Sequence, residues 1–230
     1  MKALALMSGG RDSLLAACMM IEEGFDLVPF FCDNGHIQGV NRIYDTVGMI
    51  DERYGTMFEQ ETVIASTAMT AHRYMQSHWY LTPEQLAQSY PGAQGYQLNC
   101  LACRTSMYTH AIAYCKANQI TDICDGVRRS QGFFVDKTMY IEQICRLCDD
   151  HGIKFHTPVI DIWDDFDRKR KLCDRGMPTK TFEAQCFLGS ELKNVPVGQE
   201  TSLMNFFDKE LRPLLSVDID NLIPVYRQLH

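Results

Sequence analysis

The chain has 230 residues, of which 46% are hydrophobic and 22% are charged, a composition that can bury one full core and is typical of a globular protein. Its formal net charge of −7 and pI near 5.5 argue against a broad basic surface that would bind nucleic acid through its phosphates. No stretch reaches the roughly 18 to 20 consecutive apolar residues of a membrane helix, and Met1-Lys2 leads directly into a short apolar run and a glycine turn, so we expect a cytoplasmic protein without a membrane span.

Short apolar runs alternate with segments of helical character in the first part of the chain. Gly24 ends the first helical segment, and the polar turn Asp33-Asn34-Gly35 follows the second apolar run. We expect strands over residues 2–7, 26–32 and 61–65, and helices over residues 12–23 and 39–54. Strands that alternate with helices indicate a parallel sheet.

The alternation is interrupted over residues 66–99 and then resumes. This segment contains His72, His78 and Trp79 without a clean period, so we interpret it as an insertion that covers the mouth of the substrate site. Beyond it we expect helices over residues 104–116, 136–150, 164–175 and 203–215, and strands over residues 121–124 and 154–158. The pattern predicts an α/β fold with a doubly wound parallel sheet of about five strands, in a main domain over residues 1–195 with a short helical extension over residues 196–230.

The turn after the first expected strand has the composition of an anion-binding loop. Ser8, Gly9 and Gly10 lie between the strand and the helix, where backbone N–H groups and the positive end of the helix dipole can hold a phosphate. The Gly-Lys-Ser/Thr ending of a Walker loop is missing, which argues against an ordinary phosphoryl-transfer P-loop. Asp12 beside the loop is suited to hold Mg²⁺ against a pyrophosphate.

The string Ser-Gly-Gly-Arg-Asp-Ser at residues 8–13 resembles the Ser-Gly-Gly-x-Asp-Ser signature of the PP-loop, or N-type, ATP pyrophosphatases. The resemblance implies an adenine nucleotide alpha hydrolase-like fold, with ATP and Mg²⁺ bound. It also implies an enzyme that cleaves ATP between the α and β phosphates and transfers AMP to a carbonyl oxygen, which a nucleophile then displaces. The residues expected to bind the nucleotide are Ser8, Gly9, Gly10, Arg11, Asp12 and Ser13 in the loop, Asp33 and Asn34 after the second strand, and Asp125 and Gly126 after the fourth strand, where open α/β sheets place ligands.

Three of the ten cysteines form a second candidate site. Cys100 and Cys103 are spaced CxxC immediately before the helix expected over residues 104–116, where the positive helix end lowers the pKa of a thiol. Cys186 lies far downstream, just past the helix expected over residues 164–175. A medium-sized chain without a signal peptide favours metal binding or thiol chemistry over disulfides. Asp12, Cys100, Cys103 and Cys186 are therefore the candidate catalytic residues.

A CxxC pair joined by a distant cysteine is similar to the arrangement in the PP-loop enzymes that thiolate tRNA. In some of these, three cysteines hold a [4Fe-4S] cluster with one open iron. The Cys-Phe-Leu-Gly string at residues 186–189 is also similar to the Cys-Phe-Ile-Gly segment of the 2-thiouridine synthases, where the late cysteine carries a persulfide and needs no cluster. The sequence leaves a cluster on Cys100, Cys103 and Cys186, a persulfide with its resolving cysteine, and structural zinc or simple packing as alternatives.

The leading functional hypothesis is an ATP-dependent sulfurtransferase whose acceptor is either tRNA or a small base or nucleotide, with a separate sulfur donor. An alternative is an amide- or nitrile-forming PP-loop enzyme, because the string FCDNGH at residues 31–36 is similar to a turn of the 7-cyano-7-deazaguanine synthases. That family carries a C-terminal four-cysteine zinc cluster, whereas this chain has no cysteine after Cys186. A nucleotide-binding module without turnover is the third hypothesis.

Overall fold

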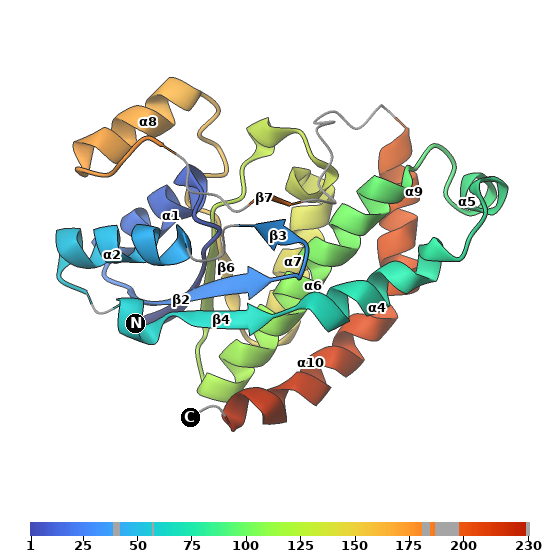
Figure 1. The fold of residues 1–230 in the computed structure, drawn as a ribbon, viewed down its shortest axis with the longest axis horizontal. Helices are drawn as coiled ribbons and strands as arrows, with labels where there is room; N and C mark the ends of the chain where they lie inside the picture. The colour runs from blue at the N-terminus through green and yellow to red at the C-terminus, as the bar shows by residue number, and fades with distance from the viewer. Residues whose placement is uncertain (39–41, 57, 181–184, 187–197, 229–230) are drawn as a thin grey trace.

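The computed structural model describes residues 1–38, 42–56, 58–180, 185–186 and 198–228 (Figure 1). Five parallel strands form the central sheet in the order β4-β2-β1-β5-β6. The strands are β1 (Lys2–Leu6), β2 (Asp26–Asp33), β4 (Val63–Ser66), β5 (Asp122–Asp125) and β6 (Lys154–His156). All five expected strands and the parallel α/β class are confirmed. The strand order reverses between β1 and β5, which is where open sheets of this kind bind ligands.

Strand β1 lies at the centre of the sheet because its side chains are apolar on both faces. Leu4 pairs with Val28 of β2 and with Ile123 of β5. Leu4 and Leu6 belong to the hydrophobic cluster on one face of the sheet, whereas Ala3 and Ala5 belong to the cluster on the other face. The continuous apolar run of β1 therefore packs against helices on both faces of the sheet.

Helices cover both faces of the sheet, as Figure 1 shows. The first layer contributes Leu14, Val47 and Leu172 to one cluster, and the second contributes Tyr74, Tyr108 and Ile144 to the other. The first layer consists of α1 (Arg11–Glu22), α2 (Arg42–Tyr54) and α8 (Asp165–Asp174). The second consists of α4 (Ala68–Trp79), α6 (Gly95–Asn118), α7 (Thr138–Asp150), α9 (Gln199–Phe206) and α10 (Arg212–Arg227).

Four shorter helical elements and a small sheet complete the described fold. The helical elements are α3 (Phe58–Glu61), α5 (Pro83–Ser89), η1 (Arg129–Gln131) and η2 (Phe134–Asp136). The small sheet pairs β3 (Ile37–Gln38) with β7 (Gln185–Cys186) in antiparallel fashion, with Ile37 opposite Cys186. This pairing brings the predicted late cysteine back to the end of β2.

The segment without a clean period, residues 66–99, contains two helices and the start of a third. Helix α4 buries Ala71, Tyr74, Met75 and His78, which are spaced as one helical face. The stripe was missed in the sequence because Tyr and His take apolar positions in it. Helix α4 packs on α6, where the Tyr74 hydroxyl lies 3.1 Å from Oγ1 of Thr109. The interpretation of residues 66–99 as an insertion stays a prediction.

Helix α6 begins at Gly95, well before the expected start at residue 104. Gln94 and Gln97 cap its first turn reciprocally, and the Gln94 N–H donates to Oε1 of Gln97 at 2.9 Å. The cap was overlooked because glutamine is an uncommon N-cap residue. The prediction that Cys100 and Cys103 precede the helix is therefore wrong: both lie inside it.

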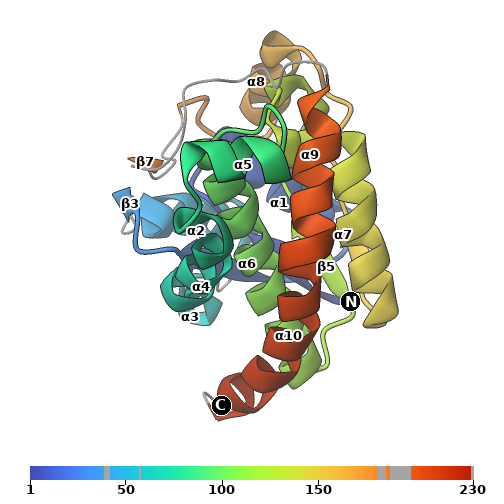
Figure 2. The same ribbon diagram turned by 90° about the vertical axis from the view of Figure 1, so that its right-hand side faces the viewer.

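The C-terminal helix is much longer than residues 203–215. A π-helical turn (Phe207–Leu211) joins α9 to α10, and Figure 2 shows the two helices as one continuous arm. Leu203, Phe206 and Leu215 are buried in the same cluster as the α6 side chains, so the arm forms part of the core. In the described part of the chain, no helix combines the length and the apolar character needed to cross a membrane.

Candidate functional site

The loop between β1 and α1 is folded as an anion cradle. Gly9 has a φ of 75°, a left-handed conformation that glycine adopts without strain. Ser13 Oγ donates to the Gly10 carbonyl at 3.0 Å, and the Gly10 N–H donates to Oγ of Ser8 at 3.2 Å. No side chain caps the start of α1, so its first N–H groups are left for a phosphate.

Gly126 lets the end of β5 approach this loop closely. A Cβ atom at Gly126 would lie 2.4 Å from the backbone nitrogen of Ser13 and 2.6 Å from the carbonyl carbon of Asp12. Any side chain at this position would therefore displace the start of α1. Gly126 is therefore needed for the packing of β5 against the start of α1, whether or not it contacts a nucleotide.

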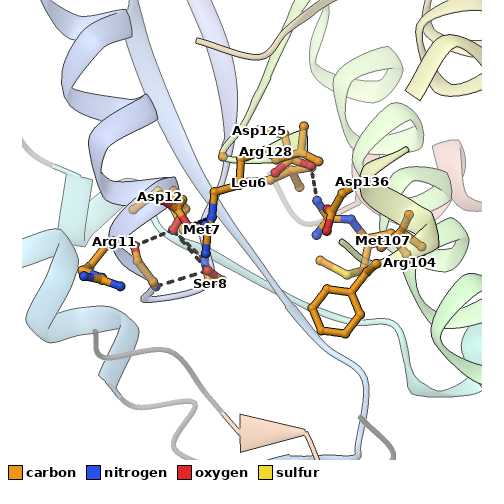
Figure 3. Close-up of a pocket in the computed structure, with 16 residues that line it drawn as sticks. Leu6, Met7, Ser8, Arg11, Asp12, Arg104, Met107, Asp125, Arg128 and Asp136 are labelled. Atoms are coloured by element: carbon orange, nitrogen blue, oxygen red, sulfur yellow. Dashed lines mark hydrogen bonds and ion pairs between the residues drawn. The ribbon is translucent and has the colours of Figure 1, made fainter. Parts of the chain in front are cut away.

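A polar cavity opens at the carboxyl ends of β1 and β5 (Figure 3). The loop and α1 contribute Ser8, Gly10, Arg11, Asp12 and Ser13. The end of β5 and the chain after it contribute Asp125, Gly126, Arg128 and Asp136, and α6 contributes Arg104 and Met107. We call this the phosphate cavity. It brings together the predicted pair Asp125 and Gly126 and all the predicted loop residues except Gly9, which does not line it.

Asp12 is ion-paired on both carboxylate oxygens. Arg128 Nε lies 2.6 Å from its Oδ2, and Arg168 Nε lies 3.1 Å from its Oδ1. Because each carboxylate oxygen has a second lone pair, Asp12 can hold Mg²⁺ while it stays close to both guanidinium groups. The sequence did not identify Arg128 or Arg168 as site residues, because nothing in the acidic-to-basic pattern of α8 indicates that Arg168 reaches back to the loop.

A second set of charged residues, Arg104, Asp125 and Asp136, also lines the phosphate cavity. Asp125 Oδ2 lies 2.5 Å from Arg104 Nη2 and accepts the Tyr108 hydroxyl at 2.6 Å. Asp136 is buried, and its Oδ2 atom has no hydrogen-bond partner among the described residues. Burial raises the pKa of the Asp136 carboxyl to about 7, although Arg104 nearby opposes the shift. Asp136 could not be identified as a site residue from the sequence, which places it only at the start of an expected helix.

The three predicted cysteines line one further cavity, which we call the cysteine cavity. Cys100, Cys103 and Cys186 are joined there by Asn34 and by apolar side chains that include Met75. The Asn34 side-chain amide donates to Sγ of Cys103 at 3.0 Å. Asn34, expected beside adenosine, thus borders the cysteines, while the Asp33 carboxylate accepts the Gly35 N–H at 2.9 Å within its own turn.

The expected lowering of the thiol pKa by a helix start is not found. Burial raises the pKa of Cys103 to about 11, and the Asn34 hydrogen bond offsets part of the shift. Cys103 lies beyond the first turn of α6, where the positive end of the helix has little influence. Among the described residues, no disulfide joins the cysteines and no group of three His, Cys, Asp or Glu side chains is arranged to hold a metal ion.

The two cavities adjoin. Arg104, Met107, Phe133 and Val135 line both of them, so these four side chains form a shared wall between the phosphate loop and the cysteines. The sequence could place each site at the same edge of the sheet, but it could not show that they have a wall in common. The arrangement allows a molecule activated in the first cavity to meet a sulfur atom in the second.

Comparison with known proteins identifies a similar fold but no similar sequence. No protein-family model and no curated protein matches the chain. A 4-thiouridine synthetase in complex with RNA and bound ATP superposes with a TM-score of 0.63 at 15% identity, over 97% of this chain and 53% of that chain. A predicted subunit of a tRNA methyltransferase from Methanocaldococcus jannaschii matches with a TM-score of 0.41 at 15% identity, over 84% of this chain and 99% of that chain.

The first of these matches confirms the fold that the Ser-Gly-Gly-Arg-Asp-Ser motif predicts. This chain spans about half the length of the 4-thiouridine synthetase.

Proposed function

We propose that the chain is an AMP-forming, ATP-dependent sulfurtransferase that activates a carbonyl oxygen in the phosphate cavity and delivers sulfur from the cysteine cavity. The observation that carries the proposal is the wall that the two cavities share. Activation and sulfur delivery need two chemically different sites within reach of one substrate atom. Three cysteines in the second cavity favour sulfur over ammonia as the nucleophile.

The cradle residues account for binding of the leaving pyrophosphate. The uncapped start of α1 and the Ser8 hydroxyl are donors for its oxygen atoms, while the Ser13 hydroxyl donates to the Gly10 carbonyl and holds the loop in shape. Mg²⁺ held at Asp12 supplies positive charge against the pyrophosphate. Arg128 and Arg168 lie against the same carboxylate, so with Mg²⁺ at Asp12 the positive charges beside the nucleotide exceed the one negative charge of Asp12.

The bond changes of the proposed reaction balance with a persulfide on Cys186. The substrate carbonyl oxygen attacks the α-phosphorus, pyrophosphate leaves, and the oxygen carries AMP. The terminal sulfur of the Cys186 persulfide then attacks the carbon, and AMP leaves with the oxygen. The Cys103 thiolate attacks Sγ of Cys186, which releases the thiocarbonyl product and forms a disulfide that an external thiol reduces.

The Asn34 amide stabilises the Cys103 thiolate in this last step, because it already donates to the sulfur. A [4Fe-4S] cluster on Cys100, Cys103 and Cys186 is the other form that the sequence resemblance implies. Since the described side chains include no three-ligand group for a metal, we derive no step through a cluster.

We propose a nucleobase carbonyl as the acceptor, carried by tRNA. The presence of RNA in the 4-thiouridine synthetase complex supports tRNA, whereas the net charge of −7 supports a free base or nucleotide. Binding to bulk tRNA is expected to weaken steeply as salt is raised, because each phosphate contact releases counterions. Salt-independent binding, or binding only of free nucleosides, would assign the acceptor to the small-molecule class.

The proposal is tested by incubating anaerobically purified protein with ATP, unmodified tRNA, a small-molecule persulfide that donates its outer sulfur to Cys186, and a reducing thiol. The expected products are AMP, pyrophosphate and thiolated RNA. ADP and phosphate as the main products would remove the AMP-forming assignment, and AMP formation without any sulfur in the acceptor would remove the sulfurtransferase assignment.

A further inference from the structure

Arg104 is the charged residue of the wall between the two cavities. It follows Cys103 on α6, and the other three side chains of the shared wall are apolar. Its side chain is 22% exposed, so the guanidinium is largely withdrawn from bulk water. A largely buried cation interacts more strongly with a nearby anion than an exposed one does.

The guanidinium of Arg104 is held in place from two sides. Nη2 pairs with Asp125 at 2.5 Å, and the Tyr108 ring lies under the guanidinium with its centroid 5.2 Å from Cζ. The Tyr108 hydroxyl in turn donates to the same Asp125 oxygen at 2.6 Å. The position of Arg104 is therefore fixed before any ligand binds.

One buried donor of the Arg104 guanidinium, Nε, makes no hydrogen bond to the described residues. Leaving a buried donor unpaired is costly, whereas the neighbouring Arg128 uses its Nε on Asp12. An unpaired guanidinium donor at the junction of two cavities is suited to an anion that is present when the protein works.

We propose that Arg104 binds the α-phosphate of the nucleotide, the phosphate that remains on the substrate oxygen after pyrophosphate has left. This inference rests on the proposed function. The α-phosphate is the part of ATP that takes part in both steps: its bond to the substrate oxygen forms in the first step, and it leaves as AMP in the second. A fixed cation at the shared wall stabilises the charge on its oxygen atoms in both steps.

The test measures binding of AMP, adenosine and pyrophosphate by calorimetry, so that it needs no acceptor and no turnover. Wild-type protein is expected to bind AMP more tightly than adenosine. Arg104→Gln is expected to reduce this preference by about tenfold or more, since it removes a charge-assisted contact. Pyrophosphate, which occupies the cradle, is expected to bind both proteins equally. Arg73→Gln is the matched control, because Arg73 also pairs with a buried aspartate, Asp218, outside both cavities.

Loss of Arg104 leaves Asp125 without its partner, so thermal melting accompanies each titration. If Arg104→Gln does not fold, the comparison is made between Asp125→Asn and the double variant Arg104→Gln with Asp125→Asn, which has no uncompensated carboxylate. Retention of the AMP preference without Arg104, or absence of the preference in the wild type, overturns the inference. Failure of the wild type to bind ATP or AMP at all contradicts the proposed function itself.

Discussion

Asp12 connects the phosphate loop to two arginines, and its replacement tests the nucleotide site at a single residue. Asp12→Asn is expected to lower ATP cleavage by at least about a hundredfold, because oriented donors and Mg²⁺ carry most of this chemistry. Unlike alanine, asparagine keeps one acceptor oxygen for Arg128 or for Arg168, which pair with different oxygens of Asp12. AMP release and urea unfolding are measured together.

The control for this substitution is Asp167→Asn, since Asp167 pairs with Arg170 away from both cavities. A hundredfold loss that is matched by a loss of folded protein would mean that Asp12 acts through its ion pairs alone.

The cysteines of the second cavity are expected to act only after activation. Serine at Cys100, Cys103 or Cys186 is expected to abolish sulfur transfer while ATP cleavage stays within about threefold of wild type, because the two steps use different cavities. Labelled sulfur in the acceptor and AMP release are the two readouts. Cys145→Ser is the control, since Cys145 lies on α7 outside both cavities and packs against the core. Equal loss of both activities in the three variants would show that the cysteines only support the fold.

Asp136 makes the stability of the protein depend on pH. Its folded pKa of about 7 lies above the ordinary value of 3.8, so between these two values the native state keeps a proton that the unfolded chain has lost. The contribution of Asp136 to stability therefore falls as pH rises from about 4 to about 7. Over that window, wild type is expected to lose on the order of 2 kcal/mol more unfolding free energy than Asp136→Asn. Urea titrations at pH 4 and pH 7 measure the unfolding free energy of each protein. Asp150→Asn is the control, because Asp150 is exposed. Equal changes in unfolding free energy for wild type and Asp136→Asn would contradict the prediction.

At the scale of elements, the contact between the end of β5 and the start of α1 sets the shape of the phosphate loop. Gly126→Ala is expected to weaken ATP binding by about tenfold or more and to lower the melting temperature, because the new methyl group meets the Ser13 backbone at 2.4 Å. Gly48→Ala on α2 is the control: it has nothing within 4 Å of the added Cβ and is expected to stabilise its helix slightly. Unchanged nucleotide affinity in Gly126→Ala would mean that the loop does not need this approach.

The strands and the phosphate loop could be predicted from the sequence because their signals are local. The run Lys2–Leu6 is apolar on both faces, and the glycines and serines that follow it allow few structures other than a tight turn. The starts of α4 and α6 could not be predicted, because the evidence lies in partners elsewhere in the fold. Tyr74 and His78 occupy a helical face that is apolar only when packed on α6 and α9.

The same limit applies to the charged groups of the site. Arg168 is 4% exposed only because α8 folds back onto α1, and Cys103 is partly buried on α6, which starts earlier than its sequence suggests. Residue types indicated the chemistry of each cavity, but which charges neutralise one another depends on contacts between elements far apart in the chain.

At the scale of the whole molecule, two cavities with different chemistry meet at one edge of the sheet, where the strand order reverses. In the proposed function, one substrate atom reacts first with the nucleotide in the phosphate cavity and then with sulfur from the cysteine cavity. The proposed reaction therefore requires that the carbonyl oxygen of the acceptor leaves with AMP.

That claim is tested most directly with an unmodified tRNA transcript whose uridine carbonyl groups carry a heavy oxygen isotope. After incubation with ATP, a small-molecule persulfide and a reducing thiol, mass spectrometry of the released AMP is expected to show one heavy oxygen for each sulfur atom incorporated into the RNA. AMP that contains no label while the RNA gains sulfur would contradict activation of the carbonyl oxygen.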